Sequence, residues 1–342
     1  MTGNSTRTSR SATLADAGHL SASVVVLNYN GKHHLNACLE NLRGQQLDGG
    51  FEVLLADNGS TDGSIELARL DYPWVRVVDI GRNRGFSGGN NLAFRAAAGK
   101  YLVVLNNDTR VRPGWLAALV AAAESDLRVG AVTSKLVFAD RPHLIQNAGL
   151  LLLSDGGGAD RGSGEQDVGQ YDRREEVFGF CGGAALLRRD MLKDVGGFDE
   201  TFFAYYEDAD LSWRMRLRGW TVLYEPAAVV DHVHSATNVE GSPFFLFHAD
   251  RNRLFLLVKN ASPGLALRCI KALRTKVAQD RAVTSARPPA VARPLRRVAL
   301  SFCLHFPEML LKRLAIRARS KVSDQEIESW LYPRSRWEAR SV

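Results

Sequence analysis

Short apolar runs alternate with amphipathic stretches along the first third of the chain. Apolar runs that are rich in β-branched residues and bounded by polar turns are typical of buried strands. Here they cover residues 24–30, 51–56, 75–80 and 101–105. Helices are expected between them, over Leu35–Leu42, Ser64–Arg69 and Asn90–Ala98. Near-continuous apolar strands separated by helices predict an α/β fold with a mostly parallel sheet covered on both faces.

A different pattern follows Pro113. In chain order it predicts a helix over Trp115–Ala123, an extended stretch over Gly130–Phe138, a helix over Asp208–Arg218 and a closing strand over Thr221–Glu225. We expect three regions: a mobile tail over residues 1–21, an α/β domain over 22–260, and a helical, basic extension over 261–342. Polar clusters follow the predicted strands, and in such sheets ligands bind at the carboxyl ends of the strands.

Composition places the chain among ordinary globular proteins. Its 342 residues are 45% hydrophobic and 24% charged, enough for one large α/β domain with an appendage. No apolar run approaches the roughly eighteen residues that span a bilayer, and the N-terminus lacks the apolar segment of a secretory signal. Four scattered cysteines without paired spacing argue against a disulfide framework or a thiolate zinc site, and they favour a cytoplasmic protein.

Charge is distributed unevenly. The net charge is +7, but residues 251–342 hold 20 Lys and Arg against six Asp and Glu. Such a basic region predicts an anionic partner. Nucleic acid is disfavoured because the chain has no recognisable binding module, which leaves an anionic membrane surface. Segment Leu295–Arg319 fits a helix lying in a membrane interface, or equally one packed on the catalytic domain or on a second subunit.

Two polar turns after predicted strands carry candidate ligands. Asp57 ends the second strand, where a carboxylate can accept a hydrogen bond from a pyrimidine imide; an Asx-type turn that caps the next helix explains the same residue. Asp108, after the strand over residues 101–105, offers oxygen to a hard cation that would neutralise a departing diphosphate. A simple turn explains that residue too.

Two further clusters lie in the second half of the chain. Glu207 and Asp208 open a helix beside four aromatic residues, as a general base near a sugar face would; the alternative is an acid-rich helix N-terminus that suits the dipole. His232 and His234 follow the predicted closing strand. Either imidazole could complete the coordination of a cation at Asp108, or both could lie on an exposed strand edge.

A glycine-rich segment, Gly81–Asn91, precedes a predicted helix. Glycines there allow close approach of the backbone to a phosphate or ribose. The segment is not the dinucleotide-binding G-x-G-x-x-G pattern, and Asn28-Tyr29-Asn30-Gly31 after the first strand is not a glycine-rich turn. A dehydrogenase is therefore disfavoured.

The order and spacing of these motifs closely resemble family 2 glycosyltransferases of the GT-A fold, and most of all the bacterial rhamnosyltransferase-like branch. The resemblance covers roughly residues 22 to 260. It rests on VVVLNYN (Val24–Asn30), ADNGSTD (Ala56–Asp62), NRGFSGGNN (Asn83–Asn91), LNND (Leu105–Asp108), GGFDE (Gly196–Glu200) and YEDADLSWR (Tyr206–Arg214).

The resemblance implies a Rossmann-like sheet and a role for each matching position. In the nucleotide-sugar site it places Leu27, Tyr29, Asp57, Asn83, Gly89, Asn90, Asn107 and Gly182, with Asp57 reading the pyrimidine. It makes Asp108 the principal ligand of Mg²⁺ or Mn²⁺, with His232, or alternatively His234, as a further ligand. It makes Asp208 the catalytic base and gives Glu207 acceptor binding or orientation. The family's Asp-x-Asp motif has an acid at the position of Asn106, so this chain keeps only the second acid, Asp108.

The reaction that the resemblance implies is inverting transfer of a sugar, with rhamnose a candidate, from a nucleotide-diphosphate donor. The acceptor would be a hydroxyl of a saccharide or of a polyprenyl-linked glycolipid in cell-surface polysaccharide synthesis. Such an enzyme would be cytoplasmic and peripheral on the inner face of the membrane, and a homodimer stays open. Two other classes remain: a nucleotide-sugar-binding protein without turnover, and a nucleotidyltransferase, which would need a basic glycine-rich loop after the first strand.

Overall fold

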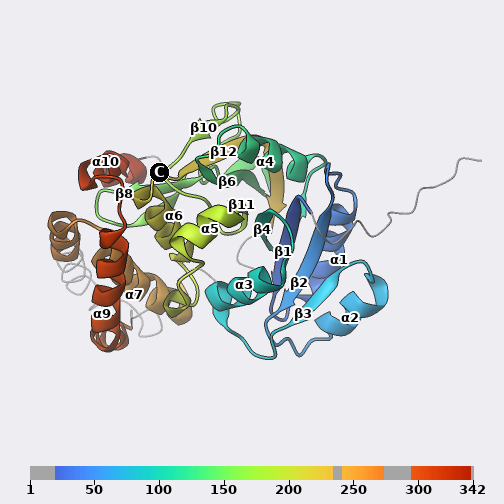
Figure 1. Ribbon diagram of the computed structural model, residues 1–342, viewed down its shortest axis with the longest axis horizontal. Coiled ribbons are helices and arrows are strands. Elements are labelled where there is room, and N and C mark those ends of the chain that lie inside the picture. Colours follow the sequence, from blue (N-terminus) through green and yellow to red (C-terminus); the bar gives the residue numbers. More distant parts are fainter. Residues whose placement is uncertain (1–19, 234–240, 273–293, 340–342) are drawn as a thin grey trace, which may run out of the picture.

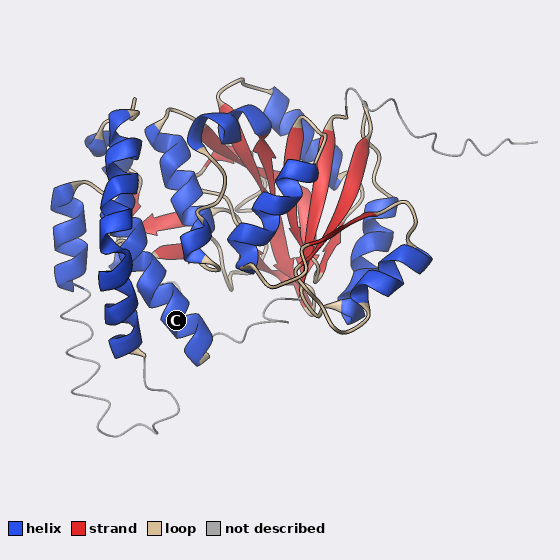
Figure 2. Cartoon of the chain, turned by 60° about the horizontal axis from the view of Figure 1, so that its bottom comes forward, coloured by secondary structure: helices blue, strands red, loops and turns tan. Residues whose placement is uncertain are grey.

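The computed structural model describes residues 20–233, 241–272 and 294–339. A ten-stranded mixed sheet forms its centre, a small three-stranded sheet lies beside it, and helices cover both (Figures 1 and 2). The predicted tail over residues 1–21 lies almost entirely outside the described residues, as does His234. No helix in the described part of the chain combines the length and apolar character needed to cross a bilayer.

The described residues form the following strands and helices, which alternate most regularly from β1 to β4. The strands are β1 (Ala22–Asn28), β2 (Phe51–Asp57), β3 (Arg76–Asp79), β4 (Tyr101–Asn106), β5 (Thr109–Val111), β6 (Val129–Phe138), β7 (Arg141–Asn147), β8 (Leu150–Leu153), β9 (Gly158–Asp160), β10 (Glu175–Glu176), β11 (Ala184–Arg188), β12 (Thr221–His232) and β13 (Leu331–Tyr332). The helices are α1 (Lys32–Arg43), α2 (Ser64–Asp71), α3 (Gly85–Ala96), α4 (Trp115–Glu124), α5 (Arg189–Val195), the short 3₁₀ helix η1 (Glu200–Phe202), α6 (Glu207–Leu217), α7 (Pro243–Asn260), one over residues 263–272, α9 (Leu295–Ala318), α10 (Asp324–Glu328) and α11 (Arg334–Glu338).

The main sheet is mostly parallel. Its order is β10-β12-β6-β11-β4-β1-β2-β3, and β3, β2, β1 and β4 run parallel to one another. β11 is antiparallel to both of its neighbours, β4 and β6, and β6 is parallel to β12. Only β11 is therefore reversed within the seven strands from β12 to β3. The parallel strands all end at one edge, where the predicted polar turns lie.

Alternate strand residues serve two separate cores, because successive side chains of a strand point to opposite faces. Val24 and Val26 of β1 pack with α1, α2 and α4, whereas Val25 packs with α3, α5 and α6. Both faces of the sheet are thus buried, which explains why these strands read as continuous apolar runs.

The C-terminal residues pack on the α/β body around a third core. This core joins β8 and the outer side of α6 to α7, α9 and α10, with Trp213, Phe255 and Met309 among its fully or almost fully buried members. β13 pairs in parallel with β8 and extends the small sheet. The expected boundary near residue 260 coincides with the end of α7, and the residues after it help to build this shared core.

Two expected elements differ from the structure. α3 begins at Gly85, five residues before the expected Asn90, so the glycine-rich segment supplies the first turns of the helix instead of a loop ahead of it. β12 continues to His232 instead of ending at Glu225, since the strand stays paired with β6 and then also with β5. His232 is therefore the last residue of that strand.

Candidate active site

One cavity of about 980 Å³ opens at the carboxyl edge of the parallel strands. Residues from widely separated parts of the sequence meet in its wall. Among those expected from the sequence, the wall contains Leu27, Tyr29, Asn83, Asn107, Asp108, Gly182, Glu207, Asp208 and His232. Two predicted cation ligands, Asp108 and His232, therefore line one cavity with the predicted base, Asp208.

Asp108 and His232 form a close pair in this cavity. His232 Nε2 lies 3.1 Å from Asp108 Oδ1, and both side chains are about nine-tenths buried. The pairing follows from the sheet, because β12 and β5 pair antiparallel with His232 opposite Thr109. Burial alone would raise the pKa of Asp108, but the hydrogen bond and charge of His232 outweigh burial, and the pKa is lowered.

The other nitrogen of His232 is held by Gln146. Gln146 Oε1 lies 2.8 Å from His232 Nδ1, so Nδ1–H donates and Nε2 carries the lone pair in the neutral ring. With a cation bound, that lone pair and the Asp108 carboxylate could both act as ligands; without one, the hydrogen bond from His232 to Asp108 requires a proton on Nε2. A ligating histidine usually donates its second N–H to such an oxygen.

The donor set fits a divalent cation that completes its coordination from elsewhere. One carboxylate and one imidazole suit Mn²⁺ or Mg²⁺ with phosphate oxygens and water as the remaining ligands. Among the described residues, no group of three or more His, Cys, Asp and Glu side chains is arranged to hold a metal ion. Asn106, which departs from the acidic motif, lines the same wall with its Nδ2 3.4 Å from His232 Nε2.

Glu207 and Asp208 begin α6 and face the same cavity. Asp208 Oδ2 accepts a hydrogen bond from Gly182 N (3.1 Å), and its Oδ1 accepts one from Ala209 N (2.7 Å). Burial raises the pKa of Asp208 despite these hydrogen bonds. Burial and the nearby Asp208 raise the pKa of Glu207 well above its ordinary value, and Glu207 Oε2 has no hydrogen-bond partner among the described residues. Both environments favour the protonated form more than water does.

The segment that leads into α6 is strained. Within residues 201–206, which we call the strap, Phe203, Tyr205 and Tyr206 have φ values of 65°, 70° and 68°, in the left-handed region that non-glycine residues rarely adopt. This backbone sets the position from which Glu207 and Asp208 enter the cavity. Strain of this kind persists only where surrounding contacts hold it.

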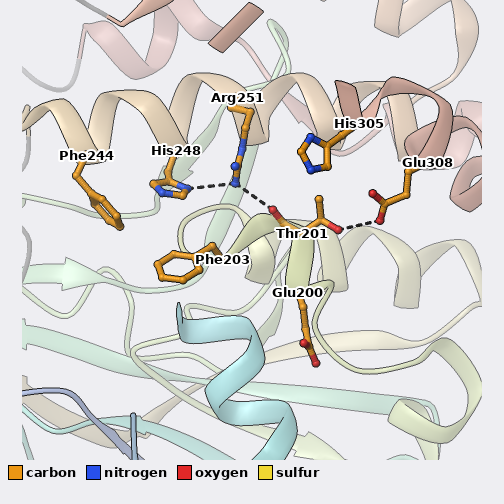
Figure 3. A pocket seen from close by; sticks show the side chains of 8 residues that line it. All are labelled: Glu200, Thr201, Phe203, Phe244, His248, Arg251, His305 and Glu308. Atoms are coloured by element: carbon orange, nitrogen blue, oxygen red, sulfur yellow. Dashed lines mark hydrogen bonds between the residues drawn. The ribbon is translucent and has the colours of Figure 1, made fainter. Parts of the chain in front are cut away.

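Two adjacent residues of α7 hold the strap. The Nδ2 of fully buried Asn252 donates to the carbonyl oxygens of Phe202 (2.9 Å), Ala204 (2.8 Å) and Tyr205 (2.7 Å). Arg251 donates from Nη2 to the carbonyl oxygens of Thr201 (3.0 Å) and Phe202 (2.9 Å), and Figure 3 shows it reaching from α7 to Thr201. Arg251 Nε also donates to Asn252 Oδ1 (2.9 Å), which fixes the amide orientation.

The opposite wall is formed by the ends of β1 and β3 and the start of α3. Leu27 and Tyr29 line it, and Tyr29 is 38% exposed, so its ring is open to a ligand. Asn83 Oδ1 accepts hydrogen bonds from Gly85 N (2.8 Å) and Asn58 Nδ2 (3.3 Å). Asn107 donates to Asn28 Oδ1 (2.7 Å), which ties the turn before Asp108 to the end of β1.

Asp57 does not reach the cavity wall. Its side chain is fully buried, with Oδ2 accepting from Asn28 Nδ2 (2.9 Å) and Oδ1 from Gly59 N (3.1 Å) and Ser60 N (2.7 Å). This is the Asx-type turn that the sequence also allowed. Asp57 thus shapes the turn that brings Asn58 to the wall, and its expected contact with a base stays a prediction.

Gly89 and Asn90 also lie behind the wall. A Cβ on Gly89 would meet Leu27 Cδ1 at 2.5 Å, so glycine is needed for α3 to approach β1. Asn90 is fully buried and donates to Phe86 O (3.0 Å), while its Oδ1 has no partner among the described residues. Both residues help α3 to pack, and their expected proximity to a ribose or diphosphate stays a prediction.

Several residues that line the cavity, or that hold the strap in place, were not expected from the sequence. Gln146 follows no motif, since it is one residue of an edge strand, and Asn252 lies in the middle of a helix. Arg253 of α7 and Arg334 and Trp337 of α11 line the same cavity. The only signal in the sequence for this part of the site was the excess of Lys and Arg over residues 251–342, which predicted an anionic partner.

Comparison with known proteins agrees with this geometry. Residues 23–196 match the family model of glycosyl transferase family 2. The N-acetylglucosaminyl-diphospho-decaprenol L-rhamnosyltransferase of Mycobacterium tuberculosis is 31% identical over 262 residues, which cover 70% of this chain and 85% of that protein. The pre-mycofactocin glycosyltransferase of the same organism is 27% identical over 222 residues, which cover 63% of this chain and 43% of that protein.

Solved structures share the fold. The mannosyltransferase of Pyrobaculum calidifontis in complex with GDP-Man and Mn²⁺ matches with a TM-score of 0.52 and 19% identity, over 87% of this chain and 85% of that one. GalNAc-T7 with UDP, GalNAc and Mn²⁺ matches with a TM-score of 0.55 and 17% identity, over 68% of this chain but only about half (47%) of that one. These likenesses identify the architecture as the GT-A fold.

Proposed function

This chain belongs to glycosyl transferase family 2, and from that premise we propose that it transfers a sugar with inversion from a nucleoside-diphosphate donor to a lipid-linked saccharide. The observation that carries the proposal is the meeting of Asp108, His232 and Asp208 in one cavity. An L-rhamnosyl donor and a polyprenyl diphosphate acceptor are the first choices, because the Mycobacterium tuberculosis relative is named for both.

Asp208 is the proposed base. It takes the proton of the acceptor hydroxyl, whose oxygen attacks the anomeric carbon while the bond from that carbon to the diphosphate oxygen breaks. Attack from the side opposite the leaving group inverts the configuration and needs no covalent intermediate. The burial that raises the pKa of Asp208 supports this role, since a base works best with a pKa near the operating pH. Glu207, whose pKa burial and Asp208 raise well above its ordinary value, is proposed to orient the acceptor.

Asp108 and His232 are the proposed ligands of Mn²⁺ or Mg²⁺, and Gln146 keeps the Nε2 of His232 available. When bound, the cation would neutralise the charge that develops on the departing diphosphate. Leu27, Tyr29 and Asn83 are proposed to line the nucleotide part of the site, with Asn107 and Gly182 between it and the base. His234 lies outside the described residues and is not included.

We also propose that the enzyme is cytoplasmic and binds the inner face of the membrane through α9. Leu300, Leu304, Leu311 and Leu314 of α9 are 65–70% exposed and form one stripe along the helix, which we call the leucine stripe. A helix of 24 residues is about 36 Å long and can lie flat in an interface.

Two basic residues in the second half of α9, Lys312 and Arg313, turn toward the protein. Lys312 Nζ binds Asp199 Oδ1 (2.7 Å), and Arg313 Nη1 donates to the carbonyl oxygens of Val258 (2.9 Å) and Ala261 (2.6 Å). An ordinary surface helix has one apolar face, which lies inward. In α9, Met309 and Phe302 already pack inward in the third core, so the outward leucine stripe is a second apolar face. It supports an apolar environment for the outer face.

Charge favours lipid over a second copy as the occupant of the leucine stripe. Exposed Arg296 and Arg297 lie at one end of the stripe, and Arg319 and Lys321 lie at the other. Side-by-side pairing of two such helices, parallel or antiparallel, would bring like charges together, whereas anionic headgroups would neutralise them. Leu311→Glu should release the protein from vesicles that contain phosphatidylglycerol, while Leu70→Glu, at a still more exposed leucine on α2, should not. Loss of a dimer in Leu311→Glu, without vesicle binding by the wild type, would identify the second copy instead.

Release of nucleoside diphosphate tests the proposed reaction. Wild-type protein with Mn²⁺, dTDP-rhamnose or other nucleotide sugars, and a short-chain N-acetylglucosaminyl-diphospho-prenol should release nucleoside diphosphate, and NMR should show an inverted anomeric centre. Asp208→Asn should lower the rate by about 10²–10⁴-fold. Donor binding without release, for every donor and acceptor, would support a binding protein; retained configuration or an unaffected Asp208→Asn variant would refute the mechanism.

A further inference from the structure

We infer that Arg253 and Arg334 form a binding site for the diphosphate of a lipid-linked acceptor. The site lies where α7 and α11 line the active-site cavity. The inference rests on the proposed function and specifies the chemistry of its acceptor. Arg253 belongs to α7 and Arg334 to α11, and both lie beyond the 23–196 segment that matches the family model.

The two guanidinium groups converge on one carboxylate. Asp155, in the turn between β8 and β9, has its Oδ2 3.1 Å from Arg253 Nη2 and 3.2 Å from Arg334 Nη1. Its Oδ1 accepts from Gly157 N (3.0 Å), which fixes the carboxylate between the arginines. Two arginines held side by side match the paired oxygens of a diphosphate, because each guanidinium presents a planar fork of donors.

The described residues do not supply strong acceptors for all hydrogen-bond donors of these two arginines. The side chain of Arg253 is only 11% exposed, and its Nε has no hydrogen-bond partner among the described residues. Arg334 Nε binds Glu338 Oε1 (2.9 Å), but Glu338 is 60% exposed, and an ion pair so open to solvent is weak. A buried cation left with an unpaired donor is disfavoured unless a ligand contributes an acceptor. Both arginines therefore retain capacity for an incoming anion.

Contacts along the cavity place the base between this site and the cation ligands. On one side, Asp208 accepts from Gly182 N, and the adjacent Gly183 O accepts from Asn106 N (2.9 Å), beside His232. On the other side, Tyr206, two residues before Asp208, receives a hydrogen bond from Gly158 N (3.4 Å) in the β8–β9 hairpin that carries Asp155. A donor diphosphate at Asp108 and an acceptor diphosphate at the arginines would thus flank the reacting hydroxyl.

The surroundings of the arginines suit an amphiphile. Phe244, Phe245 and Leu246 of the first turn of α7, and Trp337 of α11, line the same cavity as the two arginines. Arg297 of α9 lies over the Phe247 ring at 5.3 Å, so the start of α9 is beside that turn. An isoprenoid chain attached to the diphosphate could pass over these apolar residues toward the leucine stripe.

Binding of farnesyl diphosphate, compared with farnesol and with a nucleoside diphosphate, tests the site. By calorimetry, wild-type protein should bind farnesyl diphosphate and bind farnesol much more weakly. Arg334→Gln should weaken farnesyl diphosphate by about 10–100-fold, the range of a lost charge-assisted hydrogen bond, and leave nucleoside diphosphate affinity with Mn²⁺ unchanged. Arg336→Gln, exposed on the same helix, is the matched control, and Arg334→Lys should weaken binding less.

Each result bears on the inference separately from the proposed reaction. Equal farnesyl diphosphate affinity in wild type and Arg334→Gln would overturn the site even if sugar transfer is observed. An equal loss of nucleoside diphosphate affinity would reassign the arginines to the donor and also overturn it. Because these measurements need no turnover, selective loss in Arg334→Gln would uphold the site even if no donor sugar supports transfer.

Discussion

Removal of the Asn252 amide should loosen the strap and impair catalysis without weakening donor binding. Asn252→Leu keeps a similar volume but removes the donor shared by three carbonyl oxygens. Phe202 O retains Arg251 as a donor, whereas Ala204 O and Tyr205 O lose their hydrogen bonds to the Asn252 amide. The perturbation therefore falls on the backbone just before Glu207 and on Arg251, whose Nε loses its acceptor, Asn252 Oδ1.

The expected cost can be worked from these contacts. A buried carbonyl left without a donor costs roughly 1–3 kcal/mol, and the two oxygens are only part-buried, so about 2–4 kcal/mol is the appropriate range. Three left-handed non-glycine residues store roughly 1–3 kcal/mol each, which favours relaxation once the contacts are lost. Since each 1.36 kcal/mol is a factor of ten, local opening should rise by about 30–1,000-fold.

Hydrogen exchange and kinetics together check this prediction. Peptides covering residues 201–207 should lose protection by the same factor as the rise in local opening, and kcat should fall by about 100-fold, the effect of displacing a catalytic group by roughly 1 Å. The dissociation constant of the donor should not change, because the wall at β1 and β4 is untouched. Asn260→Leu is the matched control: Asn260 is also fully buried on α7, but it binds Asp210 Oδ1 (2.8 Å) and not the strap.

The reasoning is refuted if Asn252→Leu leaves exchange in residues 201–207 at the wild-type level. It is also refuted if exchange rises but kcat stays near normal, since the strap would then not position Asp208. A fall in kcat equal to that of Asn260→Leu would indicate a general loss of stability. If nucleoside diphosphate alone restored the hydrogen-exchange protection of residues 201–207 in Asn252→Leu, the strap would belong to the donor site and not to the positioning of the base.

The site supports three further predictions. Because burial raises the pKa of Glu207 and of Asp208, their protonated forms favour the folded state; unfolding free energy should fall as the pH rises from the ordinary carboxyl range through their raised pKa values, and Glu207→Gln should reduce this fall in denaturant titrations. An unchanged pH dependence would contradict it. Gln146→Leu should raise the Mn²⁺ concentration needed for nucleoside diphosphate binding by about 10–100-fold by freeing the His232 ring, with Gln146→Glu as the milder control; equal Mn²⁺ titrations would argue against cation binding there. Gly89→Ala should lower the melting temperature, because the new methyl group lies 2.5 Å from a leucine carbon, and an unchanged melting temperature would mean that α3 shifts freely.

Much of the parallel sheet could be predicted from the sequence. The expected strands at 51–56 and 101–105 agree within one residue with β2 and β4, because strands buried on both faces must be apolar throughout. The start of α3 could not be predicted, since glycine-rich segments usually form loops. In the fold, glycine at position 85 leaves room for the strap, where a Cβ would meet Phe203 O at 2.3 Å.

The polar residues at the strand ends could be named from the sequence, but their roles could not all be separated. Asp57 and Asp108 both follow buried strands within polar turns. In the fold, the carboxylate of Asp57 turns to backbone N–H groups of its own turn, whereas Asp108 turns to His232 in the cavity. The position of an aspartate after a buried strand does not distinguish these two outcomes. It fixes the edge of the sheet at which the residue lies, but not the direction of its side chain.

The sequence by itself determined which residues stand at the carboxyl edge of the sheet, because burial on both faces restricts strand composition and a polar turn marks the end of each strand. Only the tertiary structure decided which partners complete them: Gln146 is 86 residues from His232, and Arg334 is 179 residues from Asp155. Those pairs depend on the register of β12 against its neighbours and on the packing of α7 and α11 over the small sheet. Such contacts form only when distant elements pack together, and the local pattern of apolar and polar residues does not specify that packing.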